Sequence, residues 1–224
     1  ALLLGRLESS ARAKGLAVDL AEGFGLSLAA LDLDSAFSGI ERRRAELSLR
    51  VKLDKLAVTP TAPSLAPIVP HSASLDLNMQ GIPIGELLAL AEDMQTLGIV
   101  PAPGANDAVA RLTRDGAVTL QLHPSWIESP GLRITLGGGF VSTPAAPLGG
   151  SGALIIEIEG LQRTIALLRQ QRGDPQANQA VLTMLLLQGL GRPVGTGTRA
   201  DGPLSYELTL GPDGKTQLNG TDLD

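Results

Sequence analysis

Metal or acid–base chemistry would fall first to the two histidines of the chain, His71 and His123. A zinc site needs three or four ligands gathered from His, Cys, Asp and Glu. Each histidine lies next to a proline in a turn-like context, and no third histidine or carboxylate pair at ligand spacing accompanies it. We therefore expect both histidines to be surface loop residues, and we predict that the chain binds no metal.

Two pairs of carboxylates, Asp32/Asp34 and Glu157/Glu159, have the spacing of neighbours on one face of a β-strand. In a sheet with one buried face such positions lie on the solvent side. We therefore interpret both pairs as solvated side chains rather than as a general acid and base. The sequence contains no cysteine, which excludes disulfides, thiolate catalysis and thiolate metal sites together.

Glycine-rich segments offer neither a nucleophile elbow nor a phosphate site. Ser151 has a glycine on either side, but not in the G-x-S-x-G spacing of a hydrolase. The run Gly137-Gly138-Gly139 is followed by neither a lysine nor an expected helix N-terminus that could hold a phosphate. We expect this run to end a strand or to permit a sharp bend of the sheet. The sequence thus predicts a protein that is not an enzyme and uses no cofactor.

Composition points away from nucleic acids and sugars. The formal net charge is −5, and the only basic cluster is Arg42-Arg43-Arg44, which we interpret as a solvated turn or strand entry. Aromatic residues make up only 2% of the chain, so few rings can stack on bases or sugars. We expect the single tryptophan, Trp126, to be a buried anchor. The apolar 43% of the sequence is mostly aliphatic and sufficient for a substantial core.

The strongest local pattern is strict alternation of apolar and polar residues. Alternation with a period of two predicts strands with one buried and one wet face in an antiparallel sheet. It is found in residues 47–53, 75–80, 118–122, 156–159 and 206–210. Two further strands are expected at residues 16–20 and 26–34, and the second changes phase at Ala29-Ala30, which predicts a bulge.

The start of the chain allows two interpretations. Residues 1–4 fit the first turn of a helix that ends near Lys14-Gly15, or they follow a signal peptide or membrane anchor that has been removed. No run of the sequence reaches the roughly 20 apolar residues of a transmembrane helix.

Four helices are expected in two pairs. The first pair covers residues 85–97 and 106–112, and the second covers residues 161–172 and the stretch from 175 to about 189. Asp174 and Pro175 have the types preferred at the N-cap and the first helical position. The last helix carries an apolar run over residues 181–187, which is too apolar for a helix facing water on all sides. This run must therefore lie against the sheet, a partner or a lipid phase.

The order of these elements indicates an internal β-α-α-β-β repeat. The first copy covers residues 71–143 and the second residues 151–224, after an N-terminal strand-rich region, residues 1–70, that ends in a proline-rich linker over 59–70. In such an alignment Asp115-Gly116 corresponds to Asp201-Gly202. Chance similarity between amphipathic strands is the alternative explanation. The predicted fold class is α+β: one continuous unit with a curved, mainly antiparallel sheet and helix pairs packed on one face.

The abundance of aliphatic strand faces predicts a function in binding. If the sheet curls, its apolar face forms a groove for lipid or another apolar ligand, which requires no specific polar side chain. The expected lining consists of Leu75, Leu77, Val118, Leu120, Ile156, Ile158, Tyr206 and Leu208. The alternative is a structural or assembly module that docks a partner protein or a second copy through Val181, Met184 and Leu185. The sequence leaves the ligand, the partner and the oligomeric state open.

The carboxy-terminal residues carry a resemblance to a known group. They comprise the strand SYELTL (205–210), the turn GPDGK (211–215) and the ending LNGTDL (218–223), together with the earlier strand at residues 152–161. Over residues 72–224 the chain resembles the YdgA-like bacterial envelope proteins of unknown function, which are distantly similar to AsmA-type proteins. The resemblance implies an exported or inner-membrane-anchored protein with its bulk in the periplasm, working with lipids or in outer-membrane biogenesis. It supplies no catalytic residues.

Overall fold

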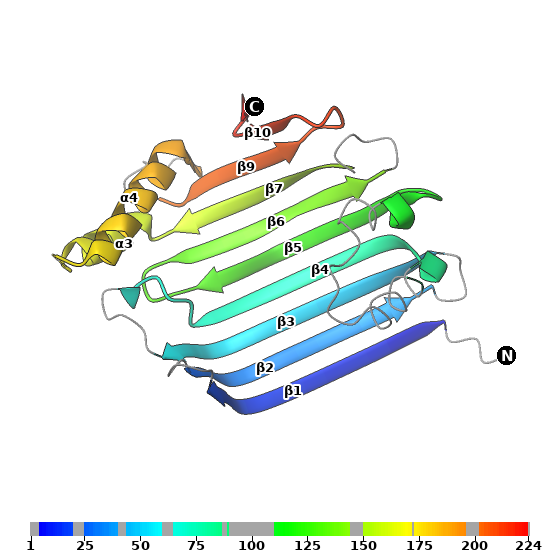
Figure 1. Ribbon diagram of the computed structural model, residues 1–224, viewed down its shortest axis with the longest axis horizontal. Helices are drawn as coiled ribbons and strands as arrows, with labels where there is room; N and C mark the ends of the chain where they lie inside the picture. Colours follow the sequence, from blue (N-terminus) through cyan, green and yellow to red (C-terminus); the bar gives the residue numbers. More distant parts are fainter. Residues whose placement is uncertain are drawn as a thin grey trace.

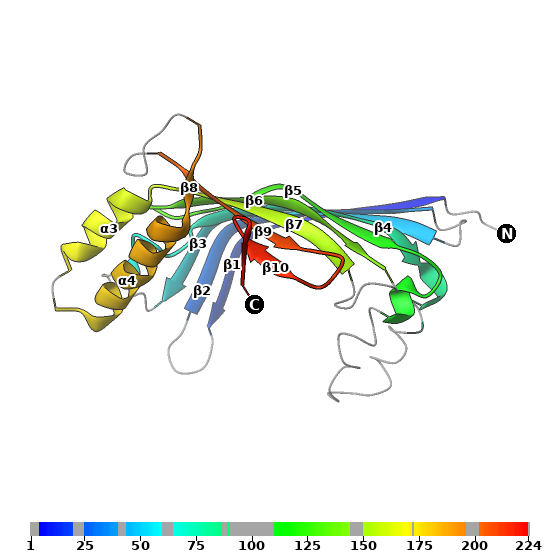
Figure 2. The ribbon, with the colours of Figure 1, turned by 90° about the horizontal axis from the view of Figure 1, so that it is seen from above.

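The computed structural model describes residues 5–19, 25–39, 44–59, 65–86, 89, 110–143, 150–171, 173–195 and 202–223. These residues form one open, twisted sheet whose strand pairs are all antiparallel, with the helices of residues 161–190 at one end and short helical segments at residues 84–86 and 110–113 toward the other (Figures 1 and 2). The strands follow one another across the sheet in the order β1-β2-β3-β4-β5-β6-β7-β9-β10-β11, and β8 pairs with β9 beside this path. The expected antiparallel sheet with its accompanying helices is confirmed.

The strands are longest at the N-terminal side of the sheet and shortest at the C-terminal side. Their bounds are β1 (Arg6–Asp19), β2 (Gly25–Ser38), β3 (Arg44–Thr59), β4 (Ser72–Pro83), β5 (Val118–Glu128), β6 (Arg133–Ser142), β7 (Gly150–Glu159), β8 (Arg192–Pro193), β9 (Leu204–Leu210), β10 (Thr216–Leu218) and β11 (Thr221–Asp222). The strands of the N-terminal region, β1 to β3, therefore belong to the same sheet as the strands of both expected repeat copies.

The first three strands correct two expectations. Residues 6–19 form β1, so the interpretation of this segment as a helix is wrong. The phase change in β2 needs no inserted residue, because its register with β1 and β3 is constant on both sides of Ala29. Instead, Gly15 and Lys55, which flank Ala29 in the neighbouring strands, have positive φ angles of 62° and 53°. The apolar pattern thus changes phase in three strands at the same height of the sheet.

A bulge does occur in β5, at His123-Pro124. The register of β5 with both β4 and β6 shifts here, which adds one residue to β5. A proline has no N–H to donate to a ladder, and a bulge is one of the few places in a sheet where it is tolerated. After the bulge, Ser125 and Ile127 occupy the face that Leu122 occupies before it, because they oppose Leu136 and Ile134 of β6. The bulge therefore keeps the apolar face continuous.

The described part of the predicted linker, residues 65–70, is not extended; residues 60–64 lie outside the described residues. Residues 65–69 form a helical turn, with the N–H groups of Ile68 and Val69 donating to the carbonyl of Leu65. The carbonyl of Pro67 accepts hydrogen bonds from the Gly131 N–H at 2.9 Å and from the Ser129 hydroxyl at 3.0 Å. This segment is thereby held against the turn between β5 and β6.

Two helices, α3 (Leu161–Arg169) and α4 (Pro175–Leu190), connect β7 to β8. The Asp174 carboxylate accepts from the N–H groups of Gln176 and Ala177, and Pro175 occupies the first helical position, which confirms the predicted start of α4. The expected first helix pair falls largely on residues 87–109, which lie outside the described residues except for Ala89. Its flanking strands, β4 and β5, are direct neighbours, as are β7 and β9 around α3 and α4.

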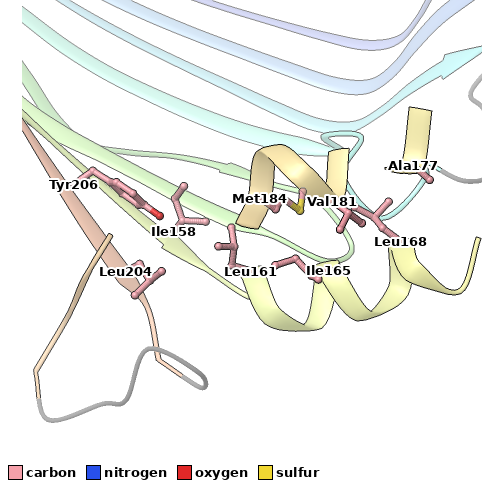
Figure 3. Packing of buried hydrophobic residues seen from close by; sticks show 9 residues of the cluster. All are labelled: Ile158, Leu161, Ile165, Leu168, Ala177, Val181, Met184, Leu204 and Tyr206. Atoms are coloured by element: carbon pink, nitrogen blue, oxygen red, sulfur yellow. The ribbon is translucent and has the colours of Figure 1, made fainter. Parts of the chain in front are cut away.

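The main hydrophobic core lies where α3 and α4 pack on one end of the sheet (Figure 3). Side chains of α3 and α4 meet the even-numbered residues of β7 and β9, which share one face of the sheet. The members are Ile158, Leu161, Ile165, Leu168, Ala177, Val181, Met184, Leu204 and Tyr206. Leu168 and Leu204 are both only 1% exposed, so this cluster is the best-buried apolar part of the described structure.

Tyr206, the only tyrosine, anchors α4 to the sheet. Its hydroxyl donates a hydrogen bond to the carbonyl oxygen of Leu187 at 2.7 Å, and burial raises its pKa above the ordinary value.

We expect the single tyrosinate absorbance to appear with a midpoint above about 10 in a native-state alkaline titration. Because the folded-state pKa is raised, the contribution of this tyrosine to stability is present below the unfolded pKa and is lost as the pH rises through the folded pKa. Replacing Tyr206 with phenylalanine should remove that alkaline loss. A native midpoint at or below about 10 would contradict this description of the site.

Candidate functional site

Only one end of the apolar sheet face is covered by α3 and α4. Beyond them, the same face is hollowed into a groove of about 430 Å³ whose lining is almost wholly apolar. Two neighbouring rows of the sheet build it, each running across the strands from β4 or β5 to β9 or β10. The first row is Leu77, Leu122, Gly138, Leu154 and Leu208, and the second is Leu120, Phe140, Gly152, Leu210 and Thr216.

The hollow exists because each row has a glycine between two large side chains. Gly138 separates Leu122 from Leu154 in the first row, and Gly152 separates Phe140 from Leu210 in the second. These glycines also allow β6 and β7 to approach closely. A Cβ on Gly152 would lie 2.7 Å from the Cα of Phe140, nearer than such atoms pack. The two glycines lie in neighbouring rows on the adjacent strands β6 and β7. The space left by their missing side chains therefore forms one depression.

Three of the eight predicted lining residues line this groove, and the others share its face. Leu77, Leu120 and Leu208 are in the lining. The remaining five lie to either side of the groove. Ile158 and Tyr206 are buried in the core under the helices, and Ile156 packs against that core. Val118 is buried beyond the opposite end of the groove, and Leu75 lies outside the lining with 39% of its surface exposed. The alternation pattern thus placed residues on the correct face but could not tell which part of that face the helices cover.

Sequence reasoning missed the residues that shape the groove. Leu122, Leu154 and Leu210 continue the same alternation as the predicted residues, so the signal was present in the sequence. Of the two roles expected for Gly137-Gly138-Gly139, the end of a strand is wrong, because the three glycines lie in the middle of β6, and the bend of the sheet stays a prediction. Their position opposite large aliphatic residues depends on the register between strands, which a sequence alone does not provide.

The predicted partner interface on α4 is divided between the inside and the outside of the protein. Val181 and Met184 are 8% and 7% exposed and pack in the core against α3 and the sheet. Leu185, in contrast, is 37% exposed. Of the three predicted contact residues, only Leu185 is therefore accessible to a partner.

The opposite face of the sheet is polar and carries cross-strand ion pairs. Arg12 pairs with Asp32, and the hydrogen bond from this guanidinium lowers the pKa of the Asp32 carboxyl below its ordinary value. Arg50 pairs with Asp76, with an Nη2–Oδ2 distance of 2.6 Å. Among the described residues no group of three His, Asp or Glu side chains is arranged to hold a metal ion. Asp32 and Asp76 thus link neighbouring strands.

No family model matches this chain. No curated protein or solved structure is significantly similar to it either. The part of the chain that the structure describes contains no helix of the length and hydropathy needed to cross a bilayer. The function is therefore inferred from the groove.

A second hollow, of about 410 Å³, lies at the start of β3 and is lined mainly by polar residues, among them Arg44, Glu46 and Gln80. The Nε and Nη2 atoms of Arg44 are buried, and within the described residues they have no hydrogen-bond partner. The guanidinium lies over Gly116, where a Cβ would come within 3.2 Å of its Cζ atom. Buried N–H groups of a charged side chain that lack a hydrogen-bond partner are costly because they have lost their hydration.

Replacing Arg44 with methionine, which keeps an apolar stem, is therefore expected to raise the free energy of unfolding by about 1–3 kcal/mol. Denaturant unfolding followed by circular dichroism measures the free energy of unfolding of the variant and the wild type. The matched control is Arg50→Met, which removes an exposed ion pair and should change stability by less than about 1 kcal/mol. A loss of stability in Arg44→Met would show that this guanidinium has a stabilising partner in solution.

Proposed function

We propose that this protein is a non-enzymatic carrier or receptor that binds the acyl chain of a lipid, or a similarly apolar ligand, in the groove on its sheet. The observation that supports this most directly is an apolar hollow that the described helices α3 and α4 leave uncovered. Its volume of about 430 Å³ lies within the roughly 300–1,000 Å³ of small-molecule sites. A surface of this kind in contact with water is unfavourable, and an apolar ligand would relieve it.

The lining favours an aliphatic chain over a polar or aromatic ligand. The large side chains are leucines with one phenylalanine, and Thr216 is the polar residue of the two rows that build the groove. Each methylene group moved from water into such a site contributes about 0.8 kcal/mol before the entropy of binding is subtracted. Affinity would therefore grow with chain length, while the headgroup would extend beyond the lining.

The cellular setting that we propose is the bacterial envelope. The resemblance of residues 72–224 to envelope proteins supports a periplasmic location at the inner membrane. The proposed duplication is supported by strand order, because β4-β5-β6 and β7-β9-β10 are each three successive neighbours in the sheet.

Binding of a dansylated fatty acid to purified protein tests this function. Leu208→Gln places an amide in the groove and is expected to weaken binding at least tenfold, because a buried amide without a partner costs roughly 1–3 kcal/mol. Leu75→Gln is the matched control, since Leu75 lies on the same face with nearly the same exposure, 39% against 36% for Leu208, but outside the lining.

Native mass spectrometry of the purified protein should, in parallel, detect copurified lipid that denaturation releases. The proposal would be abandoned if the wild-type protein bound neither the dansylated fatty acid nor copurifying lipid. It would also be abandoned if Leu75→Gln and Leu208→Gln weakened binding equally, because the groove would then not be the binding site.

A further inference from the structure

The outward side of α4 carries a leucine surface that the core does not use. We define the α4 leucine surface as Leu182, Leu185, Leu186 and Leu190, which are 63%, 37%, 70% and 54% exposed. Successive helical residues are rotated by about 100°, so Leu182 and Leu186 project from the side of α4 opposite to Ala177 and Met184. Those two residues are buried in the core. The leucine surface therefore faces away from the protein.

The groove does not account for this surface. No residue of α4 is in the groove lining, which is formed by β4 to β7, β9 and β10. A stable interface between two proteins buries roughly 800 Å² on each partner, whereas four partly exposed leucines offer only roughly a few hundred Å². A second copy would thus require contacts beyond these leucines, while insertion into a lipid headgroup region has no such minimum area.

The charges around the α4 leucine surface favour an anionic lipid bilayer. The helical hairpin of residues 161–190 contains three arginines and a single acidic residue, although the chain as a whole has a net charge of −5. Arg163 and Arg169 of α3 are exposed. The carboxylate of Asp174 is occupied in capping α4, where it accepts from two backbone N–H groups. Exposed leucines on an uncharged helix, joined to a helix that carries exposed arginines, are a combination suited to membrane interfaces.

We infer that α3 and α4 form a membrane-docking end: the α4 leucine surface inserts into the headgroup region of an anionic bilayer, and the arginines of α3 contact the lipid phosphates. Because α3 and α4 cover one end of the apolar face, docking would hold the sheet with that end at the bilayer. This inference concerns a surface separate from the groove and does not rest on what the groove binds.

Cosedimentation with vesicles of phosphatidylglycerol and phosphatidylcholine tests the docking. The double variant Leu182→Gln/Leu186→Gln is expected to partition onto anionic vesicles at least tenfold more weakly than the wild type. The matched control is Leu7→Gln/Val18→Gln, two residues of β1 that are 57% and 51% exposed, which should leave partitioning unchanged. Arg163→Gln/Arg169→Gln should weaken binding to anionic vesicles and leave any binding to pure phosphatidylcholine vesicles unaffected.

Two results would overturn the inference: wild-type protein that does not sediment with anionic vesicles, or equal loss in the α4 and β1 variants. Sedimentation equilibrium identifies the competing occupant, because a dimer that Leu182→Gln/Leu186→Gln converts to monomer would assign the surface to a second copy. Fatty-acid binding without vesicles separates the two proposals. The α4 variant should retain it, and Leu208→Gln should lose it while retaining vesicle binding.

Discussion

Replacement of Leu168 by alanine is expected to lower the free energy of unfolding by about 2–5 kcal/mol, because it empties the centre of the best-buried cluster. Leu168 is 1% exposed and lies in α3 among side chains of α4 and the sheet. These helices are held to the sheet mainly through this cluster, so its loss should also release them from the end of the apolar face. Denaturant unfolding monitored by helical circular dichroism measures the effect.

The same substitution at Leu182 provides the control. Leu182→Ala removes the same atoms from an exposed position of α4, at 63% exposure, and should change stability by no more than about 0.5 kcal/mol. The description of the core would be contradicted if the two variants were equally destabilised, since burial alone distinguishes the two leucines.

A methyl group at Gly152 is expected to destabilise the protein by at least about 2 kcal/mol and to weaken fatty-acid binding. In Gly152→Ala the new Cβ would meet the backbone of β6, at 2.7 Å from the Cα of Phe140, so β6 and β7 must move apart. The displacement falls within the groove, so stability and binding should decline together. Thermal unfolding and dansylated fatty-acid titration of the same sample measure both.

Gly189→Ala is the matched control, because an added methyl group at Gly189 would contact no other part of the protein. A Cβ there has no heavy atom within 4 Å, and the residue lies in the last turn of α4. The free energy of unfolding of this variant should be higher by about 0.5–1 kcal/mol, because alanine restricts the unfolded chain and favours the helix. If Gly152→Ala were as well tolerated as Gly189→Ala, close approach of the strands could not be the reason for glycine in the groove.

Local chemistry made much of the fold predictable. Alternation in residues 47–53 and 118–122 identifies strands and their faces, because each side chain points opposite to its neighbour. The pair Asp174-Pro175 identifies the start of α4 through a carboxylate acceptor and a residue that needs no N–H partner. The turn at Pro212-Asp213-Gly214 is confirmed between β9 and β10, with Gly214 at a φ of 84°. Each of these features depends on residues close together in the sequence.

The parts that could not be predicted depend on which elements meet. The run from Val181 to Leu187 is apolar on several sides, so periodicity could not show that Val181 and Met184 face inward while Leu182 and Leu186 face outward. Likewise, Gly138 and Gly152 form a hollow only because the register sets them between large residues of neighbouring strands. The groove is therefore a property of the assembled sheet, which no single strand reveals.

The outermost strand, β1, has a consequence for how the sheet can be extended. Among the described residues β1 pairs with β2 alone, so its outer row of backbone N–H and C=O groups is open to an incoming strand. Charged residues, including Arg6, Glu8 and Arg12, are distributed along this strand. Charges of this kind discourage indiscriminate pairing between edges. A strand that continued the sheet would lie beside these charges, so pairing would favour a strand that places opposite charges across from them.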